Sequence, residues 1–321
     1  VTGVQTCALP IWRDGGLTAD EILIVKRNGT TAIQVENGGL MVPSGAALYL
    51  NPAFYPALYS DSSSTVLMLF NGGTPRKFAI NGSAYSASNY DMLVDCPVEM
   101  GVFWSGSFKA RGVPHRFVVA GAPASFDGER LLADTQKICE AEIRFWHGDA
   151  SKAKNSANPV PFKNYLFMLN AVHDGYGGLE HRNSTALICT RKDLPRQPRV
   201  TLAPTTHRQP EGYTTLLGLI SHEYFHTWNV KRLRPAEFAR YDYRAENYTE
   251  LLWFFEGFTS YYDDLLLRRA GLIDDAAYLK LLNKAITQVQ QTPGRHVQTV
   301  AQASQDAWVK YYRQDENTLN A

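Results

Sequence analysis

The chain has 321 residues, and its 32 Lys and Arg against 31 Asp and Glu leave a formal net charge of +1. This length suggests about two domains, with enough chain to bury a core in each. The near-neutral charge gives no argument for binding nucleic acid or an anionic membrane, and no apolar run approaches the length that spans a bilayer. The 4 cysteines lack Cys-x-x-Cys spacing, so we expect small core residues rather than metal ligands or disulfides.

Residues 1–11 (VTGVQTCALPI) resemble the in-frame translation of a sequencing-library adapter, for which the alternative is an ordinary strand with a Pro turn. We therefore expect a non-native segment there and begin the fold at residue 12. With the native N-terminus missing, a leader peptide would leave no trace. Periplasmic, secreted and cytoplasmic locations all stay open, and the sequence does not indicate an oligomeric state.

Residues 12–150 are predicted to form an N-terminal antiparallel β-sandwich-like domain, because short apolar runs alternate with Gly, Asn, Ser and Pro. The clearest runs are residues 22–25, 65–70 and 116–120, and Asn-Gly pairs suited to hairpin turns stand at residues 28–29, 71–72 and 81–82. An amphipathic helix is expected at residues 130–146, followed by a linker near residues 147–161.

Residues 155–321 are predicted to form a second, catalytic domain. We place Glu180 on or near an edge strand beside a cleft, directly after the glycine pair Gly177 and Gly178. Paired glycines let the backbone of an edge strand approach an extended peptide and bind it as an added strand. The alternative is a Gly-Gly turn followed by an exposed glutamate. Further strands are expected at residues 165–172 and 185–190.

Residues 222–226 (HEYFH) carry the most specific pattern in the chain. In an α-helix His222 and His226 lie one above the other on one face, so both imidazoles can bind one tetrahedral metal ion. Glu223 is then placed to act as general base on a metal-bound water. Two satisfied core histidines are the alternative. We interpret the basic residues 231–234 (KRLR) as the charge pattern of a helix C-terminus rather than a binding patch.

A catalytic metal keeps an open position and needs one more protein ligand, which a second helix supplies. Glu256 stands in its most apolar stretch, where an unpaired carboxylate is costly and a metal would relieve that cost. Asp263, seven residues further on, could orient a ligand imidazole, although we favour an exposed helix carboxylate. After Gly271, Asp274 is expected to cap another helix that runs to about residue 291.

These segments together resemble the glycyl aminopeptidase family, gluzincin metallopeptidases that usually carry an N-terminal β domain and a C-terminal PDZ domain. The matching segments are residues 222–235 (HEYFHTWNVKRLRP), 252–262 (LWFFEGFTSYY) and 174–184 (DGYGGLEHRNS), with a weaker match through residues 90–121. The resemblance implies an α+β multidomain fold, in which a thermolysin-like zinc metallopeptidase domain follows the β domain. We expect the catalytic domain to be incomplete at its C-terminus and the PDZ domain to be absent.

The resemblance implies a zinc-dependent aminopeptidase that acts on peptides with a free N-terminus and prefers small residues such as Gly or Ala. By this resemblance, one Zn²⁺ per chain is bound by His222, His226 and Glu256, with Glu223 as general base. The segment around Glu180 is similar to the Gly-Ala-Met-Glu-Asn exopeptidase motif of related zinc aminopeptidases. The Glu180 carboxylate would hold the substrate ammonium through charge-assisted hydrogen bonds.

The family's oxyanion-binding tyrosine lies in a Tyr-x-Lys-Gly segment that we expect beyond Ala321. Tyr311 and Tyr312 match the segment before it and are assigned no catalytic role. We therefore expect this chain, as an internal piece of a longer gene product, to bind zinc weakly or fold incompletely and to show little turnover. The alternatives are a thermolysin-type zinc endopeptidase without the Glu180 clamp and a catalytically incompetent peptide-binding fragment.

Overall fold

The computed structural model describes residues 89–99, 101–149, 159–197, 210–243 and 245–311, together with the backbone of short strands nearer the N-terminus. The chain divides into two compact units, Pro10–Val102 and a second unit whose described part lies within Phe103–Ala321. In the described part of the chain, no helix has the length and apolarity needed to cross a membrane.

The unit Pro10–Val102 contains short antiparallel strands and one helix. These elements are β1 (Val25–Arg27), β2 (Thr30–Glu36), β3 (Gly39–Met41), β4 (Phe70–Asn71), β5 (Thr74–Pro75), β6 (Phe78–Ile80), β7 (Ser83–Tyr85) and α1 (Tyr90–Val94). The strands that flank residues 28–29 and 81–82 pair antiparallel, which agrees with the hairpins predicted there. β4 and β5 also pair antiparallel, but Asn71 pairs with Thr74, so the turn lies at residues 72–73 rather than 71–72. The predicted strand residues 22–24 and 65–69 lie outside the described residues.

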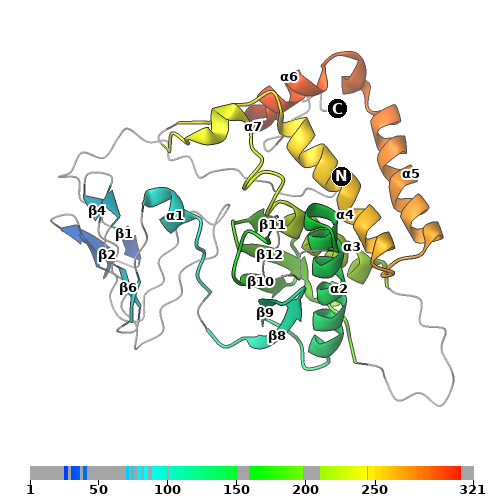
Figure 1. Ribbon diagram of the computed structural model, residues 1–321. Helices are drawn as coiled ribbons and strands as arrows, with labels where there is room; N and C mark the ends of the chain where they lie inside the picture. The colour runs from blue at the N-terminus through cyan, green and yellow to red at the C-terminus, as the bar shows by residue number, and fades with distance from the viewer. Residues whose placement is uncertain are drawn as a thin grey trace. The chain divides into compact units, whose positions relative to one another are not determined.

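The second unit is an α+β fold built on a mixed five-stranded sheet (Figure 1). Its strands are β8 (Trp104–Ala110), β9 (Val113–Ala120), β10 (Tyr165–Val172), β11 (Gly177–Glu180) and β12 (Ser184–Thr190). They lie in the order β11-β12-β10-β9-β8. The three central strands are parallel, and both edge strands pair antiparallel with their neighbours. The strands expected at residues 165–172 and 185–190 correspond to β10 and β12.

β8, β9 and the following helix belong to this sheet unit, although the sequence analysis grouped them with the N-terminal domain. β9 pairs in parallel register with β10, so that Phe117 lies opposite Phe167 and their rings stack 5.1 Å apart. This pairing continues the sheet of the second unit, which therefore begins at Phe103 rather than near residue 155. Parallel pairing across a long connection is non-local, and strand-by-strand patterns do not reveal it.

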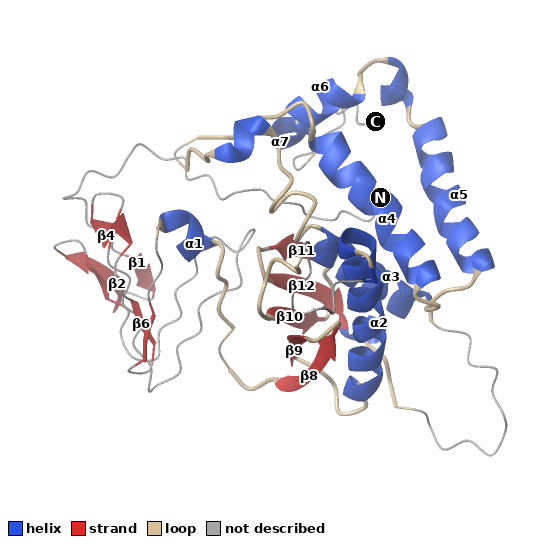
Figure 2. Cartoon of the chain, in the orientation of Figure 1, coloured by secondary structure: helices blue, strands red, loops and turns tan. Residues whose placement is uncertain are grey.

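Two helices cover one face of the sheet, as Figure 2 shows. They are α2 (Gly128–His147) and α3 (Glu211–Phe225). α2 begins where the Asp127 side chain accepts a hydrogen bond from Arg130 N, and it ends at Gly148, whose φ is 69°. It contains the whole helix predicted at residues 130–146. α2 and α3 bury their apolar side chains against the sheet, and this layer forms the core.

α3 lies between the sheet and a second helical layer, which explains why apolar residues occur all round it. The second layer contains α4 (Leu252–Arg269), α5 (Asp275–Gln291), α6 (Val300–Gln305) and α7 (Ala307–Lys310). Short 3-10 turns occur at Arg191–Asp193, Ala236–Ala239 and Pro293–His296. Asp274 caps α5 as predicted, because its side chain accepts a hydrogen bond from Ala277 N over 2.8 Å.

Candidate active site

α3 and α4 bring the three predicted metal ligands together. His222 lies in α3, His226 caps the C-terminus of that helix, and Glu256 lies near the start of α4. The two histidine Nε2 atoms are 3.0 Å apart, and Glu256 Oε2 lies 3.4 and 3.5 Å from them. Ligands about 2.0–2.1 Å from a tetrahedral zinc are roughly 3.3 Å from one another, so these atoms have the spacing of three corners of such a site. Within the described residues, this is the cluster of His, Cys, Asp or Glu suited to hold a metal ion.

Both imidazoles are fixed through their Nδ1 atoms, which leaves Nε2 directed at the shared point. His222 Nδ1 donates to Asp263 Oδ2 over 3.0 Å, and His226 Nδ1 donates to the backbone oxygen of Asn229 over 2.8 Å. Such bonds select the tautomer and the ring orientation that a metal ligand needs. The favoured interpretation of Asp263 as an exposed helix carboxylate is wrong, since α3 packs against this face of α4 and buries it.

Asn229 and Thr259, which the sequence analysis did not single out, support His226. Asn229 Nδ2 donates to Phe255 O and to Thr259 Oγ1, each over 3.1 Å, and so connects the loop after α3 to α4. Thr259 Oγ1 lies 3.5 Å from His226 Nδ1. Thr259 stands three residues after Glu256 and shares its helix face, a spacing that would have identified it.

A buried network behind His222 was also missed. Ser221 Oγ lies 3.0 Å from Glu142 Oε1 and 3.0 Å from the backbone oxygen of Asp263. Ser221, which directly precedes His222 in α3, therefore connects α3 to α2 and to α4. Burial raises the pKa of Glu142 well above its usual range, and the hydrogen bond from Ser221 opposes this shift. No local pattern identifies Glu142, because its position depends on the packing of three helices.

Glu223 is fully buried against β11. It is 0% exposed, and neither carboxylate oxygen has a hydrogen-bond partner among the described residues. A Cβ added at Gly178 would lie 2.3 Å from its carboxyl carbon. Glycine at this position therefore makes room for Glu223, whereas the sequence analysis expected it to make room for substrate. A buried carboxylate in such surroundings needs a nearby cation or donor.

Glu180 ends the edge strand β11 and is 1% exposed. The alternative of an exposed glutamate after a Gly-Gly turn is therefore wrong. Gly177 and Gly178 pair antiparallel with Ile188 and Leu187 of β12, so the β12 ladder fixes one side of their backbone. The structure thus places Glu180, Gly178 and Glu223 along one contact between β11 and α3.

The buried ionisable groups of the site shift one another's pKa values. Burial alone lowers the pKa of His222, but hydrogen bonds to Asp263 and Glu256 outweigh it and raise that pKa to about 9. For His226, burial is likewise outweighed by the Glu256 carboxylate, and the pKa is about 9. Burial raises the pKa of Glu256, yet the two imidazoles hold it at about 2. The site therefore favours positive charge at the point where the three side chains meet.

The pKa of Glu223 is raised, in contrast to that of Glu256. Burial raises the pKa of Glu223 well above the usual range, His226 opposes this shift, and Glu180 and Glu256 add to it. A cation held by the triad would favour the ionised carboxylate that a general base requires. Two imidazoles, one carboxylate and a buried unpartnered glutamate thus fit a divalent metal such as zinc, which combines nitrogen and oxygen ligands with an open position.

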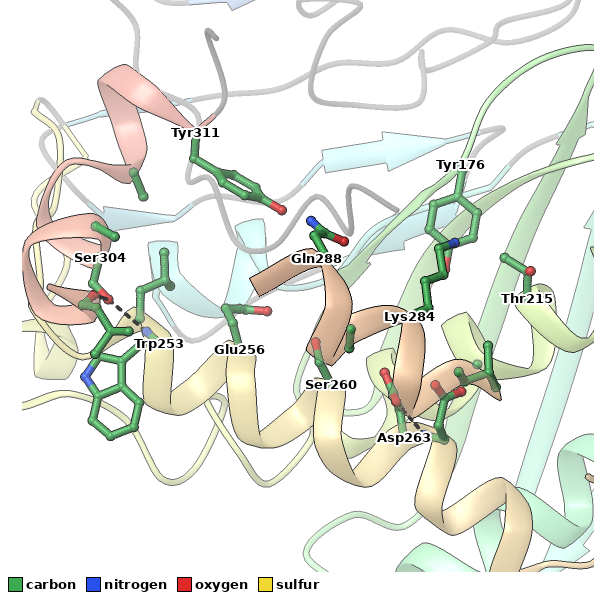
Figure 3. A pocket seen from close by; sticks show the side chains of 18 of the residues that line it. Tyr176, Thr215, Trp253, Glu256, Ser260, Asp263, Lys284, Gln288, Ser304 and Tyr311 are labelled. Carbon is green, nitrogen blue, oxygen red and sulfur yellow. Dashed lines mark hydrogen bonds between the residues drawn. The ribbon is translucent and has the colours of Figure 1, made fainter. Parts of the chain in front are cut away.

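A cleft of about 460 Å³ lies beside Glu256. Glu256, Ser260 and Asp263 line it along α4, and Tyr176 and Tyr311 reach it from the loop before β11 and from the end of α7 (Figure 3). Burial and the Glu256 charge raise the pKa of Tyr311, so its phenol stays protonated. Tyr311, which was assigned no catalytic role from the sequence, thus lines the cleft, and Tyr312 lies outside the described residues.

α3 ends at Phe225, so residues 231–234 lie in the turns beyond it and are not the charge pattern of its last turn. Cys139 and Cys189 are buried as expected, whereas Cys96 is exposed. Cys7 lies outside the described residues.

Comparison with known proteins agrees with this geometry. Residues 215–321 match the model of the M61 glycyl aminopeptidase family. A crystal structure of an aminopeptidase N family protein from Idiomarina loihiensis is similar, with 40% sequence identity and a TM-score of 0.67. The match covers 79% of this chain and 39% of that protein, so this chain spans well under half of the relative's length. No curated protein matches the chain.

Proposed function

We propose that this chain, whose residues 215–321 match the M61 glycyl aminopeptidase family, carries the site of a zinc-dependent aminopeptidase. The site would hydrolyse the first peptide bond of peptides whose N-terminal residue is small, such as Gly or Ala. The observation that carries the proposal is the triangle of His222 Nε2, His226 Nε2 and Glu256 Oε2, with edges of 3.0, 3.4 and 3.5 Å.

In this proposal His222, His226 and Glu256 hold one Zn²⁺, and Asp263 and the Asn229 carbonyl keep the imidazoles in place. When bound, zinc supplies a Lewis acid that polarises the scissile carbonyl and acidifies water. Glu223 takes the proton of the attacking water and gives it to the leaving amine. Its burial supports this role, because a base in a dry site exchanges its proton with the substrate rather than with solvent.

Glu180 is proposed to bind the substrate ammonium, and Gly177 and Gly178 to contact the peptide backbone. The burial of Glu180 at the end of an edge strand supports this role, since an extended peptide can add to that edge. A carboxylate at a fixed distance from the metal admits only the first peptide bond. The same feature favours the aminopeptidase over the endopeptidase of thermolysin type, which needs no such carboxylate.

The proposal also includes the finer architecture. The sheet with α2, α3 and α4 would correspond to a thermolysin-like catalytic domain, and the strands within Pro10–Val102 to a β-sandwich-like N-terminal domain. Placement of the two ligand-bearing helices α3 and α4 against each other supports the first part. The antiparallel pairing within the groups β1-β2-β3, β4-β5 and β6-β7 supports the β-sandwich-like N-terminal domain.

The test measures bound zinc and hydrolysis of Gly-p-nitroanilide by wild type, Glu223→Gln and Glu180→Gln. At a zinc concentration that saturates even a weak site, we expect one zinc per chain in all three. The turnover of wild type, however small, should fall about 10²–10⁴-fold in Glu223→Gln. Glu180→Gln should cripple cleavage of free-amine substrates. If Glu180→Gln loses no more than a few-fold while an N-acetylated peptide is cut internally, the endopeptidase is the correct function. Absence of bound zinc in folded protein would reject both enzymes.

A further inference from the structure

Arg232 joins three separate segments of the backbone. Its Nη1 donates to the carbonyl oxygen of Thr227 over 2.6 Å and to that of Arg182 over 3.0 Å. Its Nη2 donates to the carbonyl oxygen of Pro161 over 3.1 Å. A planar guanidinium holds several acceptors in a fixed relative geometry, which a flexible lysine ammonium does not do. Arg232 is therefore a rigid connection between these segments.

Two of the bonded carbonyls belong to the two halves of the site. Thr227 directly follows His226 at the end of the metal-binding helix and is fully buried. Arg182 lies two residues after Glu180, in the turn that leads from β11 to β12. One nitrogen atom of Arg232 thus connects the helix that carries the metal ligands to the strand that carries Glu180.

β11 needs such a connection, because it is an edge strand of four residues, Gly177–Glu180, that pairs only with β12 within the described sheet. Two of its residues are glycines, which bring no side chains to pack against α3. Gly178 touches Glu223, but that contact limits approach without preventing separation. The hydrogen bonds of Arg232 to the Arg182 and Thr227 carbonyls oppose this separation.

We propose that Arg232 is a positioning residue that sets the distance between the Glu180 carboxylate and the metal ligands. The inference rests on the proposed aminopeptidase function. In an enzyme that cleaves only the first peptide bond, the distance between the ammonium site and the metal determines which bond is cut. A misplacement of about 1 Å can lower the rate roughly 100-fold. Loss of Arg232 would loosen this separation while leaving the triad of His222, His226 and Glu256 assembled.

Arg234 provides a matched control. It is also a partly buried arginine of the same segment, and it also donates to backbone carbonyls, those of Lys231 over 2.8 Å and Phe238 over 3.2 Å. Both acceptors lie within four residues of it, so these bonds stabilise the local turn alone. Arg234→Lys should therefore leave the distance between Glu180 and the metal ligands unchanged.

The experiment compares two zinc-binding probes, glycine hydroxamate and acetohydroxamate, which differ by a single α-amine. Calorimetry gives the dissociation constant of each for the zinc-bound full chain, and metal analysis gives the zinc content. The ratio of the two constants measures how well the amine site and the metal are spaced. The proteins are wild type, Arg232→Lys, Arg232→Met, Arg234→Lys and Glu180→Gln.

We expect wild type and Arg234→Lys to bind glycine hydroxamate more tightly than acetohydroxamate, and Glu180→Gln to lose this preference. In Arg232→Lys and Arg232→Met the ratio should fall about tenfold, with zinc content and acetohydroxamate affinity preserved. Arg232→Lys keeps the charge and the aliphatic stem. If Arg232→Met does not fold, the ratio of dissociation constants in Arg232→Lys alone tests the positioning role.

An unchanged ratio in folded Arg232 variants would overturn the positioning role alone. Equal weakening of both probes would also overturn it, because Arg232 would then support only the metal helix. Equal affinity of wild type for the two probes would reject the aminopeptidase function itself and the positioning role with it. The wild-type and Glu180→Gln measurements therefore separate the two failures.

Discussion

Gly178 leaves no room for a side chain, since a Cβ there would lie 2.3 Å from the Glu223 carboxyl carbon. We expect Gly178→Ala to displace Glu223 or to push β11 away from α3. Either movement disturbs the general base, so kcat on glycyl substrates should fall about 100-fold or more. The zinc content should stay at the wild-type value, because the three atoms nearest to the added Cβ all belong to Glu223 and none to a proposed metal ligand. Steady-state kinetics and metal analysis of the purified variant test this.

Gly257→Ala is the control for this substitution. Gly257 is adjacent to the proposed ligand Glu256, yet nothing lies within 4 Å of a Cβ added there. It stands inside α4, where alanine is the better helix former. We expect Gly257→Ala to keep full activity. If Gly178→Ala were as active as Gly257→Ala, the close contact between β11 and Glu223 would not matter for catalysis.

Asp263 acts on the metal through His222, because its Oδ2 accepts the Nδ1 proton over 3.0 Å. Asp263→Asn keeps the shape but removes the charge that orients the imidazole and makes it more basic. Zinc affinity should fall about 10–100-fold, as for other partners of metal-bound histidines. Competition with a chromophoric chelator measures the change. Asp264→Asn, at the neighbouring cleft carboxylate, should bind zinc like wild type, and an equal loss in both variants would contradict this account.

The metal-free triad holds protons that zinc must displace. The pKa values of His222 and His226 are raised from 6.5 to about 9, so the metal-free imidazoles stay protonated at neutral pH. Binding zinc at pH 7 should therefore release protons, and its apparent affinity should rise with pH until about pH 9. The stability that these protons give the metal-free fold is complete below pH 6.5 and is lost as pH rises through about 9.

Calorimetry in buffers of different ionisation enthalpy counts the released protons. The observed binding enthalpy should vary with the buffer at pH 7, and this variation should diminish near pH 9.5, about where the raised histidine pKa values have been passed. Binding enthalpy at pH 7 that is independent of the buffer would mean that the histidines are already neutral before zinc arrives.

At the scale of elements, local patterns predicted most helices and strands of the second unit. The amphipathic period predicted α2, and the apolar run at residues 165–172 coincides with β10. The helix that carries Glu256 was predicted from its apolar stretch, and α4 starts at Leu252 without a side-chain hydrogen bond from its N-cap residue Leu251. At this end Trp253 N donates instead to Ser304 Oγ of α6 over 2.9 Å, a contact between distant segments that no local pattern contains.

The candidate site was predictable where its residues lie on one helix and not where it depends on contacts between helices. The spacing of His222, Glu223 and His226 follows from the helical period. The burial of Asp263 depends on α3, and the role of Arg232 depends on a turn fifty residues earlier in the chain. Register between distant segments is set by tertiary packing, so these partners required the structure.

At the scale of the whole molecule, the proposed zinc ligands come from two helices that are far apart in sequence. His222 and His226 belong to the layer that packs on the sheet, whereas Glu256 belongs to the outer helical layer. A metal bound by all three would connect these layers and would bind the folded state but not the unfolded chain. Zinc should therefore stabilise the second unit as a whole.

Thermal unfolding with zinc and with a chelator measures this connection. At free zinc about 100 times Kd, linkage predicts roughly 2.7 kcal/mol of added stability and a higher Tm. Glu256→Gln removes the charged ligand of α4 and should reduce the zinc-dependent shift strongly. Glu250→Gln changes an exposed glutamate that precedes the same helix and should keep the full shift. If Glu256→Gln kept the full shift, zinc would be held by the two histidines without α4, and the two helical layers would not be joined through the metal.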